Sequence, residues 1–261
     1  MQQTAGVRRG PKLQVGHLLI WVVGCAVGFA AYRSITPPRM KPREWAIVTG
    51  YSLAMGTALG TILTGCGLLA YRRWRGDTSC PSRAGHWLLL LGLAAAPADV
   101  AAVVAYHLRA VQDPSYPVTP YLAQFSPGGA STWPSMHHHA VGWGVGAMVA
   151  LGFALTIHRR LERRWRAVFL VYLLAGAILA AGYIAALGLA LVGVSTRRLN
   201  FLLVHVYAGS AVLSALAILA AIVGDTRSGA PRDGLHRLGV GAWLAIAAIQ
   251  LVMYVLYLGL W

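Results

Sequence analysis

Five of the nine histidines in this 261-residue chain are expected to gather at one end of the protein. They are His107, His137, His138, His139 and His205. Imidazole nitrogens bind zinc, copper or haem iron, and they also carry protons near neutral pH. The sequence has neither an HxxxH pattern nor a paired-helix haem spacing, so no metal is assigned and the cofactor stays open. A metal or haem site and a set of hydrated interfacial histidines are the alternatives for this group.

Asp99 is the one acidic residue deep inside an apolar segment, directly after Pro97 and Ala98. It lies roughly 13 Å below the end of that segment if the segment is helical. An ionisable group at this depth in a membrane is costly and commonly functional. Asp99 is therefore either part of a transport or binding path, or a protonated carboxyl that hydrogen-bonds a neighbouring helix. Gln250 in the last apolar segment is a candidate partner.

Three short segments have the spacing of a known set of motifs. Residues 109–117 read RAVQDPSYP, residues 134–137 read PSMH, and residues 195–205 read STRRLNFLLVH. Together they resemble the motifs K-x6-R-P, P-S-G-H and S-R-x5-H-x3-D of membrane phosphatases of the PAP2 type (phosphatidic acid phosphatase type 2). The order of the motifs along the expected spans also resembles that family.

The resemblance implies a phosphatase that acts on lipid phosphates at the outer membrane face. His205 would be the nucleophile, His137 the acid that protonates the leaving alcohol, and Arg109 and Arg198 the clamp on the phosphoryl oxygens, with Ser135 assisting. The chain departs from the family pattern at several positions. Tyr116 replaces the arginine of the first motif, Met136 replaces glycine, one extra residue precedes His205, and Gly209 stands where an orienting aspartate is expected. Either an active phosphatase or a degenerate relative is implied.

The elements that must position these residues are apolar segments long enough to cross a bilayer. The chain is 57% hydrophobic and 11% charged, whereas soluble domains carry about 25% charged residues. A span needs about 20 apolar residues, and seven segments qualify. They cover residues 15–32, 46–71, 86–108, 139–157, 167–194, 201–223 and 238–260. The sequence thus predicts an all-α membrane helical bundle, one transmembrane domain over residues 1–261, with six spans if the first is removed or lies flat.

Basic residues predict the orientation of these spans. The N-terminal tail and the loops 72–85, 158–166 and 224–237 hold fifteen of the 22 Lys and Arg residues. This asymmetry favours an inside N-terminus and an outside C-terminus. It places the long loop 109–138 outside, and it excludes the orientation of G-protein-coupled receptors. The last span has no lysine for retinal, which excludes retinal proteins.

The same loops account for the net charge of +15, so no nucleic-acid partner is expected. Arginine far outnumbers lysine, which with the abundant alanine and glycine suggests a bacterial cytoplasmic (inner) membrane. The remaining histidines fall near the inner face, and for those beside arginines an interfacial capping role is expected. They are His17, His86, His158 and His236.

Small residues recur every four positions on two spans. They are Ser52, Gly56, Gly60 and Thr64 on one, and Gly142, Gly146, Ala150 and Ala154 on the other. Such stripes let two helix backbones approach closely, either within the chain or in a homodimer. Cys25, Cys66 and Cys80 have no metal-binding or disulfide spacing and are interpreted as small apolar residues.

The sequence therefore predicts a multi-pass membrane protein in the lipid bilayer with a polar, histidine-rich outer site. Its candidate binding residues are Asp99, His107, Tyr116 and His139. A PAP2-like phosphatase and a transport, metal-binding or haem-binding protein are the alternatives.

Overall fold

The structure, a computed structural model, consists of helices joined by turns in the part of the chain that it describes. That part comprises residues 15–33, 42–77, 80–95, 151–152, 161–192, 194, 197–229 and 232–259. The helices are α1 (Val15–Arg33), α2 (Pro42–Trp74), a shorter helix Ala84–Ala95, α6 (Arg163–Leu191), α7 (Arg197–Arg227) and α8 (Gly234–Gly259). No strand occurs within these ranges, so the all-α prediction is confirmed for them.

Four helices are long and apolar enough to cross a membrane, which makes this chain a membrane protein. Their apolar stretches are Thr49–Trp74, Arg163–Ala186, His205–Arg227 and Gly234–Leu256. Leu18–Ala30 and Ala84–Ala95 are shorter apolar helical stretches. Of the expected span 139–157 only residues 151–152 are described, and residues 96–108 of the expected span 86–108 are not.

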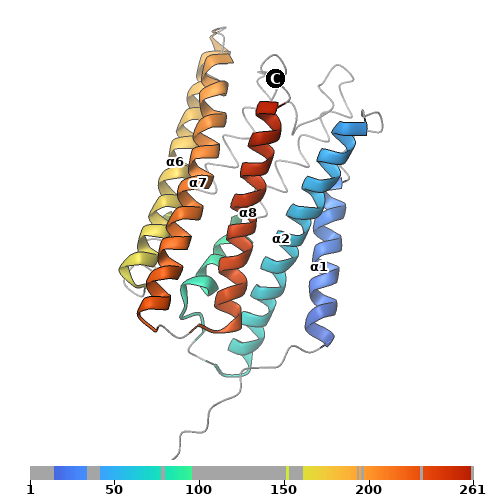
Figure 1. The fold of residues 1–261 in the computed structure, drawn as a ribbon, viewed down its shortest axis with the longest axis vertical. Helices are drawn as coiled ribbons and strands as arrows, with labels where there is room; N and C mark the ends of the chain where they lie inside the picture. Colours follow the sequence, from blue (N-terminus) through green and yellow to red (C-terminus); the bar gives the residue numbers. More distant parts are fainter. Residues whose placement is uncertain are drawn as a thin grey trace, which may run out of the picture.

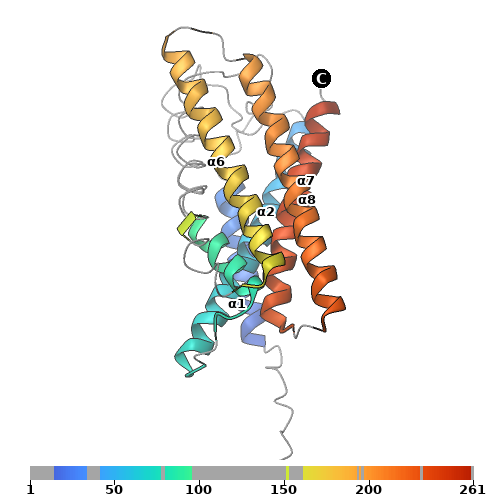
Figure 2. The same cartoon turned by 90° about the vertical axis from the view of Figure 1, so that its left-hand side faces the viewer.

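The helices pack in the order α6, α7, α8, α2, α1, each beside the next (Figures 1 and 2). Helix α2 and helix α7 finish at the end of the bundle where Ala84–Ala95, α6 and α8 begin. We call this end the arginine-rich end, because the basic segments 72–85, 161–166 and 224–237 meet there. Gly76 (φ +88°) and Gly229 (φ +62°) lie just past the ends of α2 and α7, in the left-handed conformation that terminates helices.

The small-residue stripe of α2 packs against α1. A Cβ added to Gly56 would lie 2.5 Å from the backbone nitrogen of Phe29, and one added to Gly60 would lie 2.4 Å from that of Cys25. The predicted close backbone approach is confirmed, and it occurs within the chain. A homodimer contact through Gly56 and Gly60 would therefore require α1 to move away.

We expect Gly60→Ala to weaken the α1–α2 contact, because the new methyl group meets the backbone of α1. Overpacking of this kind costs about 1–3 kcal/mol. Gly67→Ala on the same helix is the matched control, since a Cβ there meets nothing within 4 Å. Thermal unfolding in detergent micelles should show a lower midpoint for Gly60→Ala only. Equal midpoints for the two variants would contradict the packing described.

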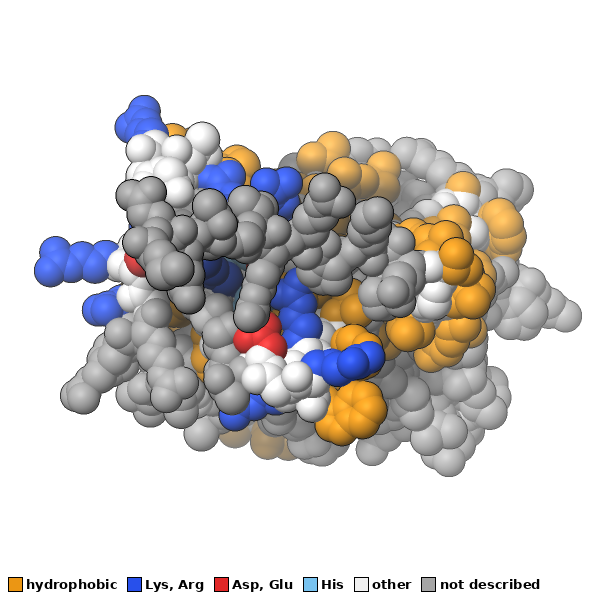
Figure 3. All heavy atoms as spheres, turned by 90° about the horizontal axis from the view of Figure 1, so that it is seen from below, with side chains coloured by type: hydrophobic (Ala, Val, Ile, Leu, Met, Phe, Trp, Pro, Cys, Tyr) orange, Lys and Arg blue, Asp and Glu red, His pale blue; other side chains and the backbone are white. Residues whose placement is uncertain are grey.

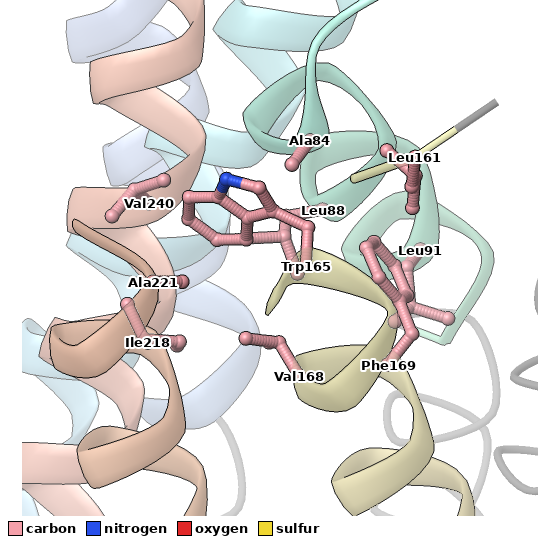
Figure 4. Packing of buried hydrophobic residues seen from close by; sticks show 10 residues of the cluster. All are labelled: Ala84, Leu88, Leu91, Leu161, Trp165, Val168, Phe169, Ile218, Ala221 and Val240. Atoms are coloured by element: carbon pink, nitrogen blue, oxygen red, sulfur yellow. The ribbon is translucent and has the colours of Figure 1, made fainter. Parts of the chain in front are cut away.

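A cluster of buried apolar residues lies at the arginine-rich end, around the indole of Trp165 (Figure 4). Its members come from α6, α7, α8, the helix Ala84–Ala95 and Leu161, two residues before α6. They are Ala84, Leu88, Leu91, Leu161, Trp165, Val168, Phe169, Ile218, Ala221 and Val240. Large apolar side chains on the outer faces of α6 and α7, such as Leu174 and Leu213, are exposed, as expected of surfaces that meet lipid. The cluster thus holds together the helix ends at the arginine-rich end of the bundle.

Candidate functional site: a buried histidine–aspartate network

Most of the residues predicted for the outer site lie outside the described residues. They are Asp99, His107, Arg109, Tyr116, Ser135, His137 and His139. Arg198 lies in the first turn of α7, without a described side chain, and His205 lies two turns further along the same helix. His205 is thus the one predicted site residue whose side chain can be placed.

His205 is half-buried on α7 and faces α8. Its ring meets the ring of Tyr254 edge to face, with 5.6 Å between the centroids. Gly209, where the PAP2 pattern expects a carboxylate, is exposed, and a Cβ there would meet no described residue within 4 Å. The hydroxyl of the next residue, Ser210, donates to the carbonyl oxygen of Tyr207 in the same helix, at 2.7 Å. Neither residue can therefore supply the charge that would orient His205 as a nucleophile.

A different polar cluster lies at the arginine-rich end of the bundle. Two buried histidines each face one aspartate across helix ends that are far apart in the sequence. We call this cluster the latch and define it as His86, Asp233, His236 and Asp225. His86 is 1% exposed, His236 is 5% exposed and Asp225 is 4% exposed, so three of the four members are shielded from solvent.

The first half of the latch is centred on Asp233, the residue before α8. Its Oδ1 accepts a hydrogen bond from the backbone N–H of His236 at 2.8 Å, which caps the first turn of α8. The Nε2 atom of His86 lies 3.1 Å from both carboxylate oxygens, and Nη1 of Arg72 lies 3.0 Å from Oδ2. One carboxylate thus joins the end of α2, the start of Ala84–Ala95 and the start of α8.

The tautomer of His86 follows from its other contacts. Its Nδ1 lies 3.4 Å from the backbone nitrogen of Ser82 and 3.5 Å from that of Arg83, where it can only accept. The hydrogen is therefore on Nε2, which donates to Asp233. Burial opposes ionisation of Asp233, but the hydrogen bonds from His86, the His236 backbone and Arg72 outweigh it and hold the pKa of this carboxyl well below its usual range. Asp233 is consequently an anion at neutral pH and pairs with Arg72.

The second half of the latch is centred on Asp225, in the last turn of α7. The indole Nε1 of Trp165 donates to Asp225, 3.2 Å from each carboxylate oxygen. Nε of Arg164 lies 2.9 Å from Oδ1, and Nε2 of His236 lies 3.7 Å from Oδ2. Arg232 approaches the same carboxylate at 3.9 Å. The start of α6 and the start of α8 are thereby tied to the end of α7.

His236 connects the two halves. Its Nδ1 accepts a hydrogen bond from the backbone N–H of Gly85 at 3.0 Å, so its Nε2 carries the hydrogen that points to Asp225. Its ring also meets the indole of Trp165 edge to face, with 5.3 Å between centroids. The backbone of the same residue donates to Asp233. A single residue therefore contacts both carboxylates of the latch.

Glycines allow the helices to come close enough for these bonds. A Cβ on Gly85 would lie 2.1 Å from the carbonyl oxygen of His236, and a Cβ on Gly239 would lie 2.0 Å from that of Gly85. A Cβ on Gly224 would lie 2.9 Å from the Cδ of Arg164, the side chain that reaches Asp225. The latch therefore depends on Gly85 and Gly239, where the contact is with backbone, whereas at Gly224 a flexible side chain could shift.

His86 and His236 are buried rather than interfacial, although both rings accept backbone N–H groups at the start of Ala84–Ala95, as a capping role predicts. Both rings are enclosed and make specific hydrogen bonds between helices. One signal was available in the sequence: of seven acidic residues, Asp225 and Asp233 lie in one basic segment at the boundary between two spans. Their pairing with histidines could not be read from spacing, because His86 and Asp233 are 147 residues apart.

The latch side chains can hold charge and protons at the helix ends. No group of three or more metal-ligating side chains occurs among the described residues. Asp233 accepts several hydrogen bonds, and Asp225 accepts one from Trp165 and pairs with Arg164, which is how buried charges are retained in proteins. Comparison of the chain with family models, with characterised proteins and with solved structures finds no match.

Proposed function

We propose that this chain is a seven-span protein of the bacterial cytoplasmic membrane, closed at its inner end by the latch and carrying a polar site on its outer face. The observation that carries the proposal is the distance between the latch at one end of the bundle and the predicted outer-site residue His205 toward the other. Asp225 and His205 lie on the same helix, α7, about 30 Å apart along its axis. The carboxylates of the latch are occupied by donors from other helices, which leaves the other end for ligand chemistry.

The position of the latch supports the inside-N, outside-C orientation. The basic segments 72–85 and 224–237, predicted to be cytoplasmic from their charge, meet at one end through the Arg72–Asp233 and His86–Asp233 contacts. Helix α8 begins at that end and finishes at the opposite one (Figure 1). A cytoplasmic latch and an external C-terminus are therefore consistent with one another.

Reporter fusions test the orientation. Alkaline phosphatase joined after Gly229, between α7 and α8, should be inactive, because that enzyme matures only outside the cytoplasm. The same reporter joined after Gly259 should be active, and green fluorescent protein should give the reverse pattern. An active phosphatase at Gly229 with an inactive one at Gly259 would contradict the proposed orientation.

The second candidate is a PAP2-like lipid phosphate phosphatase. The observation that favours it is the placement of Arg198 and His205 seven residues apart on α7, a spacing that puts two residues on one helix face. The missing carboxylate at Gly209 argues for low activity or for a degenerate relative. Transport along a path from the outer histidines to Asp99 is the non-enzymatic alternative.

Phosphate release from phosphatidic acid in detergent micelles separates these candidates. If the chain is a phosphatase, His205→Asn should lower the rate by about 100-fold or more, the usual contribution of a proton-transferring or nucleophilic group. Arg197→Gln, one position from the clamp residue, is the matched control and should retain activity. Absence of phosphate release by the wild-type protein, or equal rates for wild type and His205→Asn, would remove the phosphatase candidate.

A further inference from the structure

Arginines surround the latch at the arginine-rich end of the bundle. Ten lie there among the described residues: Arg72, Arg73, Arg75, Arg83, Arg163, Arg164, Arg166, Arg227, Arg232 and Arg237. The described carboxylates of the same segments are Asp77, Glu162, Asp225 and Asp233. Seen from this end, basic side chains lie around the acidic ones and reach outward beyond them (Figure 3). The excess of positive charge is thus at the periphery.

Arg73 and Arg166 donate to the backbone carbonyls of Cys80 and Leu161. The other eight arginines divide into two groups. Arg72, Arg164 and Arg232 contact the latch carboxylates. A second group has no carboxylate partner among the residues that the structure describes, and we call its members the rim arginines. They are Arg75, Arg83, Arg163, Arg227 and Arg237. Four of the five are exposed and Arg83 is half-buried, so their charge is available to a ligand outside the protein.

Aromatic side chains indicate the level at which the rim arginines lie. Trp74 is 81% exposed at the end of α2, and its ring lies 6.2 Å from that of Tyr71. Nε of Arg75 donates to the hydroxyl of Tyr71 at 2.9 Å, and its guanidinium lies 5.3 Å from the ring centroid. Exposed tryptophan and tyrosine at the end of an apolar helix are typical of the headgroup layer. The guanidinium of Arg75 is thereby held at the depth of lipid phosphates.

We infer that the rim arginines form a binding surface for the headgroups of anionic phospholipids in the leaflet that faces the latch. Guanidinium groups suit this partner because each can donate two parallel hydrogen bonds to one phosphate. The five side chains come from the ends of all the helices that the latch joins. Bound headgroups would therefore bridge the same helices from outside. The inference rests on the proposed membrane insertion, but not on which leaflet is cytoplasmic.

Lipid enrichment in polymer-extracted discs tests the inference. The full chain is reconstituted in vesicles of equal parts phosphatidylglycerol and phosphatidylcholine and then extracted without detergent. We expect the ratio of phosphatidylglycerol to phosphatidylcholine in discs that contain the protein to be about fivefold the ratio in empty discs, the factor that one favourable arginine contact supplies. Replacing all five rim arginines with glutamine should remove the enrichment. The corresponding five lysine substitutions keep the charge and should retain part of it.

The latch residues stay intact in both sets of variants, and retention of a folded protein is checked by size-exclusion chromatography. If the glutamine variant does not fold, the wild type and the lysine variant still test the inference. A wild-type protein that shows no phosphatidylglycerol enrichment overturns it. Enrichment that survives in a folded glutamine set also overturns it. Inorganic phosphate added at millimolar concentration should not displace the lipid, and displacement would show that a soluble anion is the ligand instead. Failure of membrane insertion would be seen separately, in the reporter fusions.

Discussion

Asp225→Asn is expected to destabilise the protein by about 3–5 kcal/mol, the usual cost of removing one partner from a buried ion pair. Asp225 is 4% exposed, and its carboxylate accepts a hydrogen bond from the indole of Trp165 and pairs with Arg164, while Nε2 of His236 lies 3.7 Å away. An asparagine of the same shape has one acceptor oxygen, and its amide group would turn N–H donors toward the donors already there. At least one buried donor then loses its partner, which leaves the full desolvation cost of that group uncompensated.

Unfolding by sodium dodecyl sulfate in mixed micelles, followed by circular dichroism, measures this change. Glu162→Gln is the matched control, because Glu162 pairs with the same Arg164 but its side chain is 57% exposed. Exposed pairs contribute at most about 1 kcal/mol, so the control should unfold close to the wild type. Equal stability of Asp225→Asn and Glu162→Gln would show that the latch does not hold the helix ends together.

The helices could be predicted from the sequence because crossing a bilayer imposes a length and an apolar composition. The predicted spans 167–194 and 201–223 correspond to α6 (Arg163–Leu191) and α7 (Arg197–Arg227), with ends that differ by three or four residues. Helix α6 ends at Leu191, three residues before the predicted bound, and the other three differences arise where arginines begin or end a helix. An apolar window stops at the first charge, whereas the backbone hydrogen bonds continue through the interfacial turn.

The latch could not be predicted in the same way, because its geometry is set by contacts between distant segments. His236 looks like an interfacial histidine until Gly85 and Gly239 bring two helix backbones together. Only then does the Gly85 N–H reach the ring nitrogen of His236 and turn its other nitrogen to Asp225. His205 is the only residue of the predicted outer site whose side chain the structure describes, and its ring lies beside that of Tyr254.

The close contact between Gly85 and Gly239 leads to the second large expected effect, from Gly239→Ala. The added methyl group would lie 2.0 Å from the carbonyl oxygen of Gly85, a backbone atom that cannot rotate away. Helix α8 would have to move away from Ala84–Ala95, which lengthens the 3.0 Å bond from Gly85 N–H to His236. We expect a loss of about 3 kcal/mol, because overpacking and the opened latch act together.

Gly241→Ala is the matched control for this variant. It lies two residues further along α8, where a Cβ meets nothing within 4 Å. Alanine is also the better helix former by about 1 kcal/mol, so this variant should be as stable as the wild type or slightly more stable.

The double variant Gly239→Ala with Asp225→Asn tests whether both changes act on the latch. If both open the same latch, the combined loss should be smaller than the sum of the single losses, since a latch already opened has little more to lose. Full additivity would indicate instead that the glycine contact and the Asp225 network stabilise the bundle independently.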